Sequence, residues 1–119
     1  MEAVIEMGGV PRIYTEGNYE NKLDLFASMP PGKVIYHFIG TDMEKVKGKL
    51  TGIACVSGGV NGTLLEYGTR EEVIADVKRN IDICAPGGGY MLDCNVSLDV
   101  AKSENLHAMF DTARNYMKY

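Results

Sequence analysis

Residues 52–65 read GIACVSGGVNGTLL, which is a short apolar run, then a glycine-rich turn, then the start of an amphipathic segment. This is the pattern with which a parallel strand passes into its crossover helix. Three weaker versions of the same pattern occur elsewhere in the chain, so the sequence predicts four consecutive strand-then-helix units. Alternating units of this kind form a parallel sheet, and the right-handed crossover rule places successive strands side by side.

Turn residues and helix caps set the boundaries of the units. Capping boxes are predicted from Thr41 to Glu44 and from Thr69 to Glu72, and Ser103 is the expected N-cap of the last helix. The expected strands are 10–14, 33–39, the beginning of 52–65, and 90–93, and the expected helices are 2–7, 20–29, 41–50, 69–85 and the segment from residue 103. The last helix is expected to bury Leu106, Met109, Phe110 and Ala113.

The composition excludes several classes of protein. A net charge of −4 gives no basic footprint, so neither nucleic acid nor an anionic membrane is an expected partner. No apolar segment approaches the roughly 18–20 residues of a membrane span, and the start of the chain lacks the pattern of a signal peptide. The cysteines Cys55, Cys84 and Cys94 are widely spaced in apolar surroundings and are expected to be buried thiols. We therefore expect a cytoplasmic location.

The number of units bears on the fold. With 119 residues the chain is expected to be a single domain, 1–119. A doubly wound sheet of four strands is one solution, whereas a (β/α)8 barrel needs about 250 residues for eight units, so four units are close to half a barrel. The unit count therefore predicts an α/β fold of four parallel strands alternating with helices, either a small doubly wound sheet or half of a (β/α)8 TIM barrel. In either fold the reactive face lies at the carboxyl ends of the strands.

Three residues at that face are the candidates for catalysis. Glu16 follows the first strand and suits a general acid or base, or a ligand for a hard cation, unless it is a surface turn residue. His37, within the second strand, together with Glu16 and Asp93 could form a proton-transfer pair or a site of one histidine and carboxylates for a metal, or else be a core histidine bonded to backbone. The motifs specify no resident metal or cofactor.

Residues at the same strand ends are the candidates for ligand binding. A tyrosine hydroxyl is a donor for a carboxylate or carbonyl, although aromatic residues at strand ends more often serve packing. The glycine-rich turn can present backbone N–H groups to an anion at a helix start, and close backbone packing explains its glycines equally well. The predicted ligand-binding residues are Tyr14, Asn18, Ser57, Gly58, Gly59 and Asn61.

Several strings line up with one family. They are GGVPRIY with Gly17-Asn18, SGGV leading to YGTREEV, then APGGGY and ENLHAM, in this order over essentially the whole chain. Together they resemble the carboxyl-terminal half of the uroporphyrinogen decarboxylase superfamily, which comprises the haem-pathway decarboxylases and the corrinoid-linked methyltransferases. The resemblance implies a (β/α)8 barrel of which this chain holds the last four strands.

The chain departs from the family at both standard sites. Where the methyltransferases have a His-x-Cys-Gly pattern that supplies zinc ligands, this chain has residues 14–17, Tyr-Thr-Glu-Gly. Where the decarboxylases have a Gly-His-Gly type turn, it has residues 95–97, Asn-Val-Ser. The decarboxylase's substrate-anchoring arginine and aspartate belong to the amino-terminal half. The resemblance is therefore to a divergent branch that lacks both standard sites.

Two functions are compatible with these features. The first is the carboxyl-terminal part of an enzyme that decarboxylates a tetrapyrrole side chain or carries out corrinoid-linked methyl transfer, inactive as an isolated chain. The second is a non-catalytic homodimeric module that binds a tetrapyrrole, a corrinoid or another multi-anionic ligand. A half barrel leaves strand edges and a sheet face uncovered. We therefore expect a homodimer, a separate amino-terminal half-barrel chain, or a piece of a longer enzyme, since Met1 falls within a mid-barrel helix.

Overall fold

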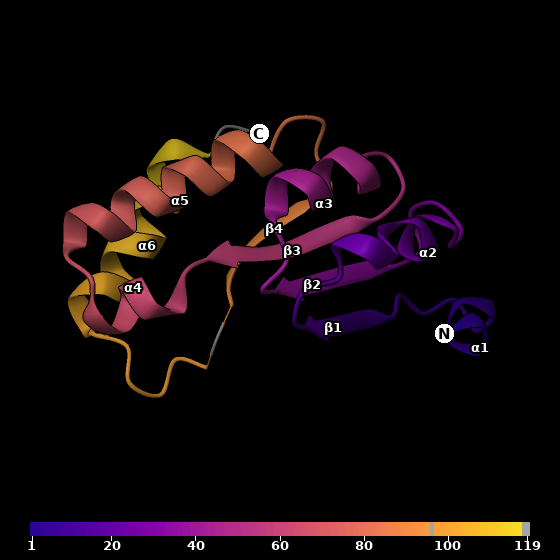
Figure 1. Cartoon of the computed structure of the whole chain (residues 1–119), viewed down its shortest axis with the longest axis horizontal. Helices are drawn as coiled ribbons and strands as arrows, with labels where there is room; N and C mark the ends of the chain where they lie inside the picture. Colours follow the sequence, from indigo (N-terminus) through magenta and orange to yellow (C-terminus); the bar gives the residue numbers. More distant parts are fainter. Residues whose placement is uncertain (96, 118–119) are drawn as a thin grey trace.

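A computed structural model describes residues 1–95 and 97–117 and shows an α/β fold (Figure 1). Four strands alternate with helices, as the sequence predicts. The strands are β1 (Arg12–Glu16), β2 (Ile35–Ile39), β3 (Cys55–Val60) and β4 (Tyr90–Cys94). The helices are α1 (Glu2–Glu6), the 3-10 turn η1 (Glu20–Lys22), α2 (Leu23–Ala27), α3 (Met43–Leu50), α4 (Gly62–Tyr67), α5 (Arg70–Cys84) and α6 (Ser103–Tyr116).

The strands form one parallel sheet in the order β1-β2-β3-β4. Tyr14 pairs with His37, His37 with Ser57, and Ser57 with Met91, so these four residues form one row across the sheet. The sheet is open, because β1 and β4 each pair with a single neighbour in the described part of the chain. Because all four strands are parallel, their carboxyl ends lie together at one end of the sheet. The turns after β1, β2 and β3 lie at this same end.

Helices cover one face of this sheet (Figure 1). Tyr36, Phe38 and Val56 from the central strands pack against Val46 and Leu50 of α3 in one apolar cluster. A second cluster joins the carboxyl ends of β3 and β4 to α4, α5 and α6. The residues in this second cluster are Val60, Leu65, Val73, Val77, Ile81, Cys94, Ala108 and Met109. Alternate strand residues point to the other face, which the described helices leave uncovered.

Glycines at the end of β3 permit its close contacts. Gly58 has a φ of +117°, and a Cβ added there would lie 2.7 Å from the carbonyl oxygen of Phe38. Gly59 has a φ of +104°, and a Cβ added there would lie 2.5 Å from Oδ1 of Asn80 on α5. Both positions favour glycine because L side chains rarely adopt such φ values. The glycines thus let the carboxyl end of β3 lie close to β2 and to α5.

Caps and strand starts differ from the prediction at several places, and strand β2 begins at Ile35 rather than at residue 33. Asp42, not Thr41, caps α3, since its carboxylate accepts the Glu44 N–H at 2.9 Å. The Thr41 hydroxyl instead donates to the Gly17 carbonyl and accepts the Tyr19 N–H, which ties the loops after β1 and β2 together. Strand β1 begins after residue 11, two residues later than predicted, because proline has no N–H to give to a sheet.

The last helix also differs from the prediction. Ser103 is the first residue of α6, and Lys102 occupies the N-cap without a side-chain hydrogen bond. Phe110 is exposed rather than buried. The buried residues of α6 are Asn105, Ala108, Met109 and Thr112. Phe110 lies about 100° around the helix from Met109, which turns it away from that side. The Thr69–Glu72 capping box of α5 is confirmed.

Helix length and the burial of two cysteines match the sequence, whereas Cys55 is not fully buried as expected. None of the described helices is long and apolar enough to cross a membrane. Cys84 and Cys94 are buried and Cys55 is half-buried, and no disulfide joins them. Burial raises the pKa of the Cys84 thiol to about 11, so this thiol is protonated at neutral pH.

Candidate functional site

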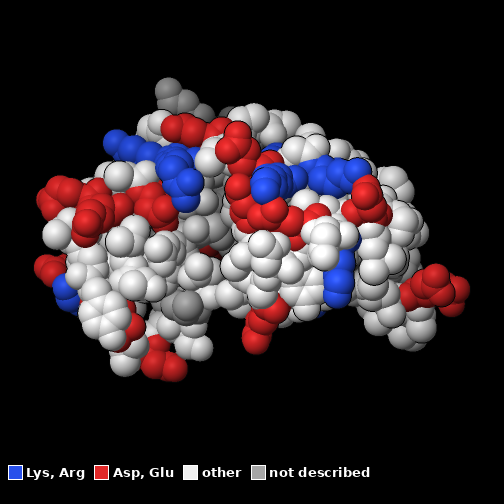
Figure 2. All heavy atoms as spheres, viewed as in Figure 1, with Lys and Arg blue, Asp and Glu red and all other residues white. Residues whose placement is uncertain are grey.

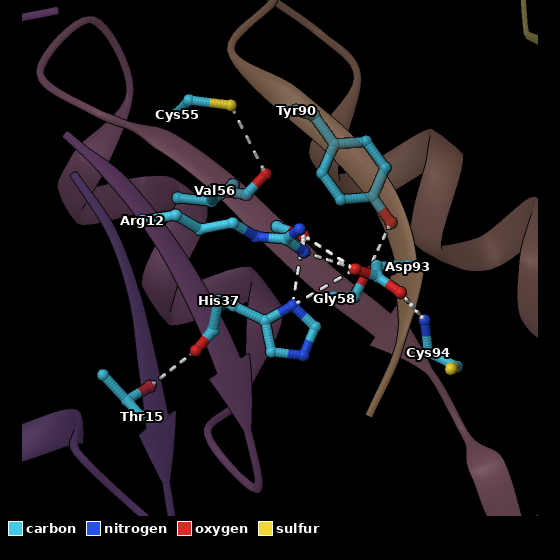
Figure 3. A network of polar contacts seen from close by, with 10 residues as sticks. Arg12, Thr15, His37, Cys55, Val56, Gly58, Tyr90, Asp93 and Cys94 are labelled. Carbon is cyan, nitrogen blue, oxygen red and sulfur yellow. Dashed lines mark hydrogen bonds and ion pairs between the residues drawn. The ribbon is translucent and has the colours of Figure 1, made fainter. Parts of the chain in front are cut away.

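The uncovered face of the sheet carries a polar cluster built from all four strands (Figure 3). Arg12 on β1 donates from Nη2 to Oδ2 of Asp93 on β4 at 2.6 Å and to the Ser57 hydroxyl oxygen on β3 at 3.3 Å. His37 on β2 places Nδ1 3.1 Å from the same hydroxyl oxygen and 3.5 Å from Asp93 Oδ2. Ser57 in turn lies 3.4 Å from Asp93 Oδ2. We name these four residues the polar cluster.

Tyr14 covers the polar cluster from the side of β1. Its ring centroid lies 4.7 Å from that of His37, and the Arg12 guanidinium carbon lies 5.0 Å from the Tyr14 ring centre. His37 and Ser57 are buried, whereas Tyr14 itself is 58% exposed. An aromatic side chain thus shields a histidine on a face that no described helix covers.

The contacts of Nδ1 indicate which ring nitrogen of His37 carries the proton. A carboxylate oxygen offers only lone pairs, so an unprotonated Nδ1 would direct its own lone pair toward Asp93 Oδ2 at 3.5 Å. A proton on Nδ1 removes this repulsion and donates to Ser57, whose hydroxyl then donates to Asp93. In this tautomer Nε2 is unprotonated and is an acceptor.

Burial sets the charge of His37. Desolvation lowers its pKa below the ordinary value of 6.5, with a smaller upward effect from the Asp93 carboxylate and a downward effect from the Arg12 guanidinium. The imidazole is therefore neutral at pH 7. A neutral ring with a fixed Nδ1–H can accept a proton at Nε2, which is the requirement for a general base.

A groove of about 740 Å³ runs along the uncovered face where the strands end. It is lined by Tyr14, Glu16, His37, Ile39, Asp93, Cys94, Asn95, Ser97 and Leu98. The polar cluster thus contributes His37 and Asp93 to the groove, and Glu16 stands at its mouth. A groove at the carboxyl ends of parallel strands is where ligands bind in α/β folds.

The structure brings most of the predicted site residues together. The three candidates for catalysis, Glu16, His37 and Asp93, all border the groove, as does Tyr14. Ser57 lies beneath them in the polar cluster. The structure thus places these five residues on one face, although their chemical roles remain predictions.

The other predicted ligand-binding residues lie outside the groove. The side chain of Asn18 accepts the Glu20 N–H at 2.9 Å within its own turn. Gly58 accepts the Tyr90 hydroxyl at its carbonyl oxygen, and Gly59 faces α5. Asn61 is the N-cap of α4. These residues have local structural contacts that account for their positions.

The backbone amides at the start of α4 are already hydrogen-bonded to side chains. The Asn61 N–H is bonded by Asp76, the Gly62 N–H by Asn95, and the Thr63 N–H by Asn61, at 2.8 to 3.0 Å. An anion could reach them only by displacing these oxygens, one of which belongs to a carboxylate. The glycine-rich turn therefore does not present a vacant anion site in this structure.

Arg12 is the member of the polar cluster that the sequence analysis did not identify. The signal was available, because Arg12 precedes Tyr14 by two residues and so points to the same face of β1. Its partner Asp93, however, is 81 residues away on the opposite edge strand. Only the reach of a long side chain across two intervening strands joins them.

Among the described residues no group of three or more His, Cys, Asp or Glu side chains is arranged to hold a metal ion.

Comparison with protein-family models, with curated proteins and with solved structures found no match for this chain. The class supported by the structure is thus an α/β protein with an open parallel sheet and a polar groove at its strand ends. The family resemblance rests on the sequence motifs.

Proposed function

We propose that this chain is the carboxyl-terminal half of a (β/α)8 enzyme of the uroporphyrinogen decarboxylase type. Its reaction would be decarboxylation of a tetrapyrrole side chain or corrinoid-linked methyl transfer. The observation that carries the proposal is the polar cluster on the uncovered face, joined to a groove at the strand ends. The active enzyme would form when a second half covers this face.

The arrangement of layers supports this proposal. In a (β/α)8 barrel consecutive strands are neighbours, every helix lies outside, and the inward side chains are packed in layers. Here the strands follow in chain order and the helices share one face. The inward row would contain Tyr14, His37, Ser57 and Met91. A second set of strands would complete the packing of that row.

The groove residues have distinct roles in the proposed site. His37 would accept a proton at Nε2, and Glu16 at the mouth of the groove would act as acid or base. Asp93 would act through His37 by fixing the proton on Nδ1, and Arg12 would hold Asp93 in place. Arg12 and Asp93 are therefore positioning residues. The arginine and aspartate that anchor the substrate in the family would come from the other half.

The alternative function is a homodimeric module that binds a multi-anionic ligand without chemistry. In the described part of the chain, β1 and β4 each have one unpaired edge. Such edges favour association with a second copy of the chain or with a separate amino-terminal half. The groove gives less support to anion binding, because the one guanidinium in the polar cluster is already paired with Asp93. On the face shown in Figure 2, Lys and Arg are interspersed with Asp and Glu and form no broad basic patch. We favour the enzyme half because Ser57 and Asp93 orient His37, which binding without chemistry does not require.

The test is reconstitution. The chain is mixed with an amino-terminal half barrel from a member of the superfamily, and the mass is followed by light scattering over a dilution series. We expect a one-to-one complex with decarboxylase or methyl-transfer activity that neither half has alone, and loss of that activity in His37→Phe. A 13.0 kDa monomer that unfolds cooperatively and does not bind the other half would contradict the proposal.

A further inference from the structure

Strand β3 departs from regular strand geometry directly after Ser57. Gly58 and Gly59 have φ values of +117° and +104°, yet they pair with Leu92 and Asp93 of β4. We call Gly58 and Gly59 the glycine pair. Glycine adopts many backbone conformations at similar cost, so two consecutive glycines do not fix their own geometry. The glycine pair therefore depends on its neighbours to hold a single conformation.

Tyr90 on β4 contacts the glycine pair. Its hydroxyl donates to the Gly58 carbonyl oxygen at 2.9 Å (Figure 3). The same hydroxyl lies 3.3 Å from the position of a Cβ added at Gly59, so it lies close to both glycines. Burial raises the pKa of the Tyr90 phenol, so the hydroxyl stays protonated and remains a donor at neutral pH. Tyr90 thus links β4 to the end of β3 by a side chain as well as by strand pairing.

This link joins the two strands that carry Ser57 and Asp93. Ser57 directly precedes the glycine pair, and Asp93 follows Tyr90 by three residues on β4. The Ser57 hydroxyl oxygen lies 3.1 Å from His37 Nδ1 and 3.4 Å from Asp93 Oδ2. The second distance is already long for a hydrogen bond, so a small shift between β3 and β4 would break it. The polar cluster is therefore sensitive to how the end of β3 is held.

We propose that Tyr90 is a positioning residue of the polar cluster, whose hydroxyl holds the glycine pair and thereby keeps Ser57 between His37 and Asp93. Ser57 then accepts the Nδ1–H of His37 and leaves Nε2 as the basic nitrogen. Tyr90 packs against the apolar cluster on the helical face of the sheet, so it acts on the uncovered face through the backbone of β3. The catalytic value of this positioning rests on the proposed function, whereas its effect on His37 is measurable without turnover.

The experiment measures the tautomer of His37 in the full chain, by long-range proton–nitrogen nuclear magnetic resonance spectra at pH 7.5, where the ring is neutral. We expect Nδ1–H to predominate in the wild type. Tyr90→Phe removes only the hydroxyl and should raise the ratio of Nε2–H to Nδ1–H about twofold to tenfold, as for the loss of one neutral hydrogen bond. Ser57→Ala should raise the ratio at least as much. Adding Tyr90→Phe to Ser57→Ala should raise it no further, because Tyr90 acts through Ser57.

Tyr36→Phe is the matched control. Tyr36 is a buried tyrosine one residue from His37, and its hydroxyl donates to the Phe26 carbonyl at 3.3 Å rather than to β3. Both variants keep the ring and its packing, so both should fold with a lower free energy of unfolding, but only Tyr90→Phe should change the tautomer ratio.

Three results would overturn the proposal. They are a wild type with the proton on Nε2, a ratio in Tyr90→Phe that is unchanged or no different from that in Tyr36→Phe, and an additive effect of Tyr90→Phe and Ser57→Ala. Because the tautomer is measured without turnover, a failed reconstitution together with the expected ratios would contradict only the proposed enzyme function.

Discussion

His37 is buried beside a carboxylate and a guanidinium, and its pKa should respond to each of them in a known direction. The Asp93 carboxylate raises the pKa of His37 and the Arg12 guanidinium lowers it. Arg12→Met should therefore raise the pKa, and Asp93→Asn should lower it further. The pKa is measured from the His37 ring signals over a pH series. A shift in the opposite direction in either variant would show that the polar cluster has a different arrangement in solution.

The same residue makes stability depend on pH. Because the pKa of folded His37 is lowered, the unfolded chain takes up a proton first as the pH falls through about 6.5. The stabilising contribution is present above that pH and is lost progressively down to the folded pKa. Urea unfolding at pH 7.5 and 5.5 should therefore show a drop that is smaller in His37→Gln. His107→Gln, at an exposed position on α6, should retain the full drop.

At the scale of elements, replacing a glycine by alanine should have opposite effects on the free energy of unfolding in β3 and in α3. Gly58→Ala places a Cβ against the Phe38 carbonyl at a φ of +117°, which costs about 1–3 kcal/mol. Gly48 lies within α3 with no atom within 4 Å of an added Cβ, so Gly48→Ala should stabilise by about 0.5–1 kcal/mol. Urea midpoints measure both changes. A neutral Gly58→Ala would mean that β3 does not have the described close approach to β2.

The capping box of α5 gives a second prediction for an element. Thr69 and Glu72 each bond the other's backbone N–H, so Thr69→Ala should destabilise by about 1 kcal/mol with an unchanged denaturant slope. Thr63→Ala is the matched control, since Thr63 lies in the first turn of α4 and is exposed. Comparable losses in the two variants would argue against a specific role of the cap.

Local signals explain which elements could be predicted. The alternation of apolar runs and glycine-rich turns gave the four strands and the main helices, and the Thr69–Glu72 spacing gave a correct helix start. The Thr41 prediction failed because Asp42, one residue later, provides an equally good oxygen for the same helix end. Phe110 was assigned to the buried side because apolar spacing does not show which neighbour a helix packs against.

At the scale of the whole molecule, the strand order followed from the crossover rule, whereas the polar cluster did not follow from any local pattern. Glu16 and Asp93 were predicted from their places at strand ends, and His37 from its place within the second strand. The ion pair between Arg12 and Asp93 depends on strand register across the full width of the sheet. Register is set by tertiary packing, which single-sequence patterns do not contain.

The uncovered face predicts how the molecule associates. Met91, 44% exposed, lies on edge strand β4 in the same row as Ser57 and His37. A lysine on an edge strand opposes pairing with another sheet, so Met91→Lys should raise the dissociation constant of a homodimer or of the reconstituted complex at least about tenfold. Leu25→Lys is the control, since Leu25 is 65% exposed on α2 within the helical layer.

Light scattering over a dilution series gives both dissociation constants. If association uses the uncovered sheet face, Met91→Lys dissociates at concentrations where the wild type and Leu25→Lys remain associated. If it uses the helical layer, Leu25→Lys is the variant that dissociates, and the polar cluster then stays open to solvent in the complex. The second result would contradict the half-barrel proposal even if a dimer forms, because a barrel can close only through the uncovered face and the free edges of β1 and β4.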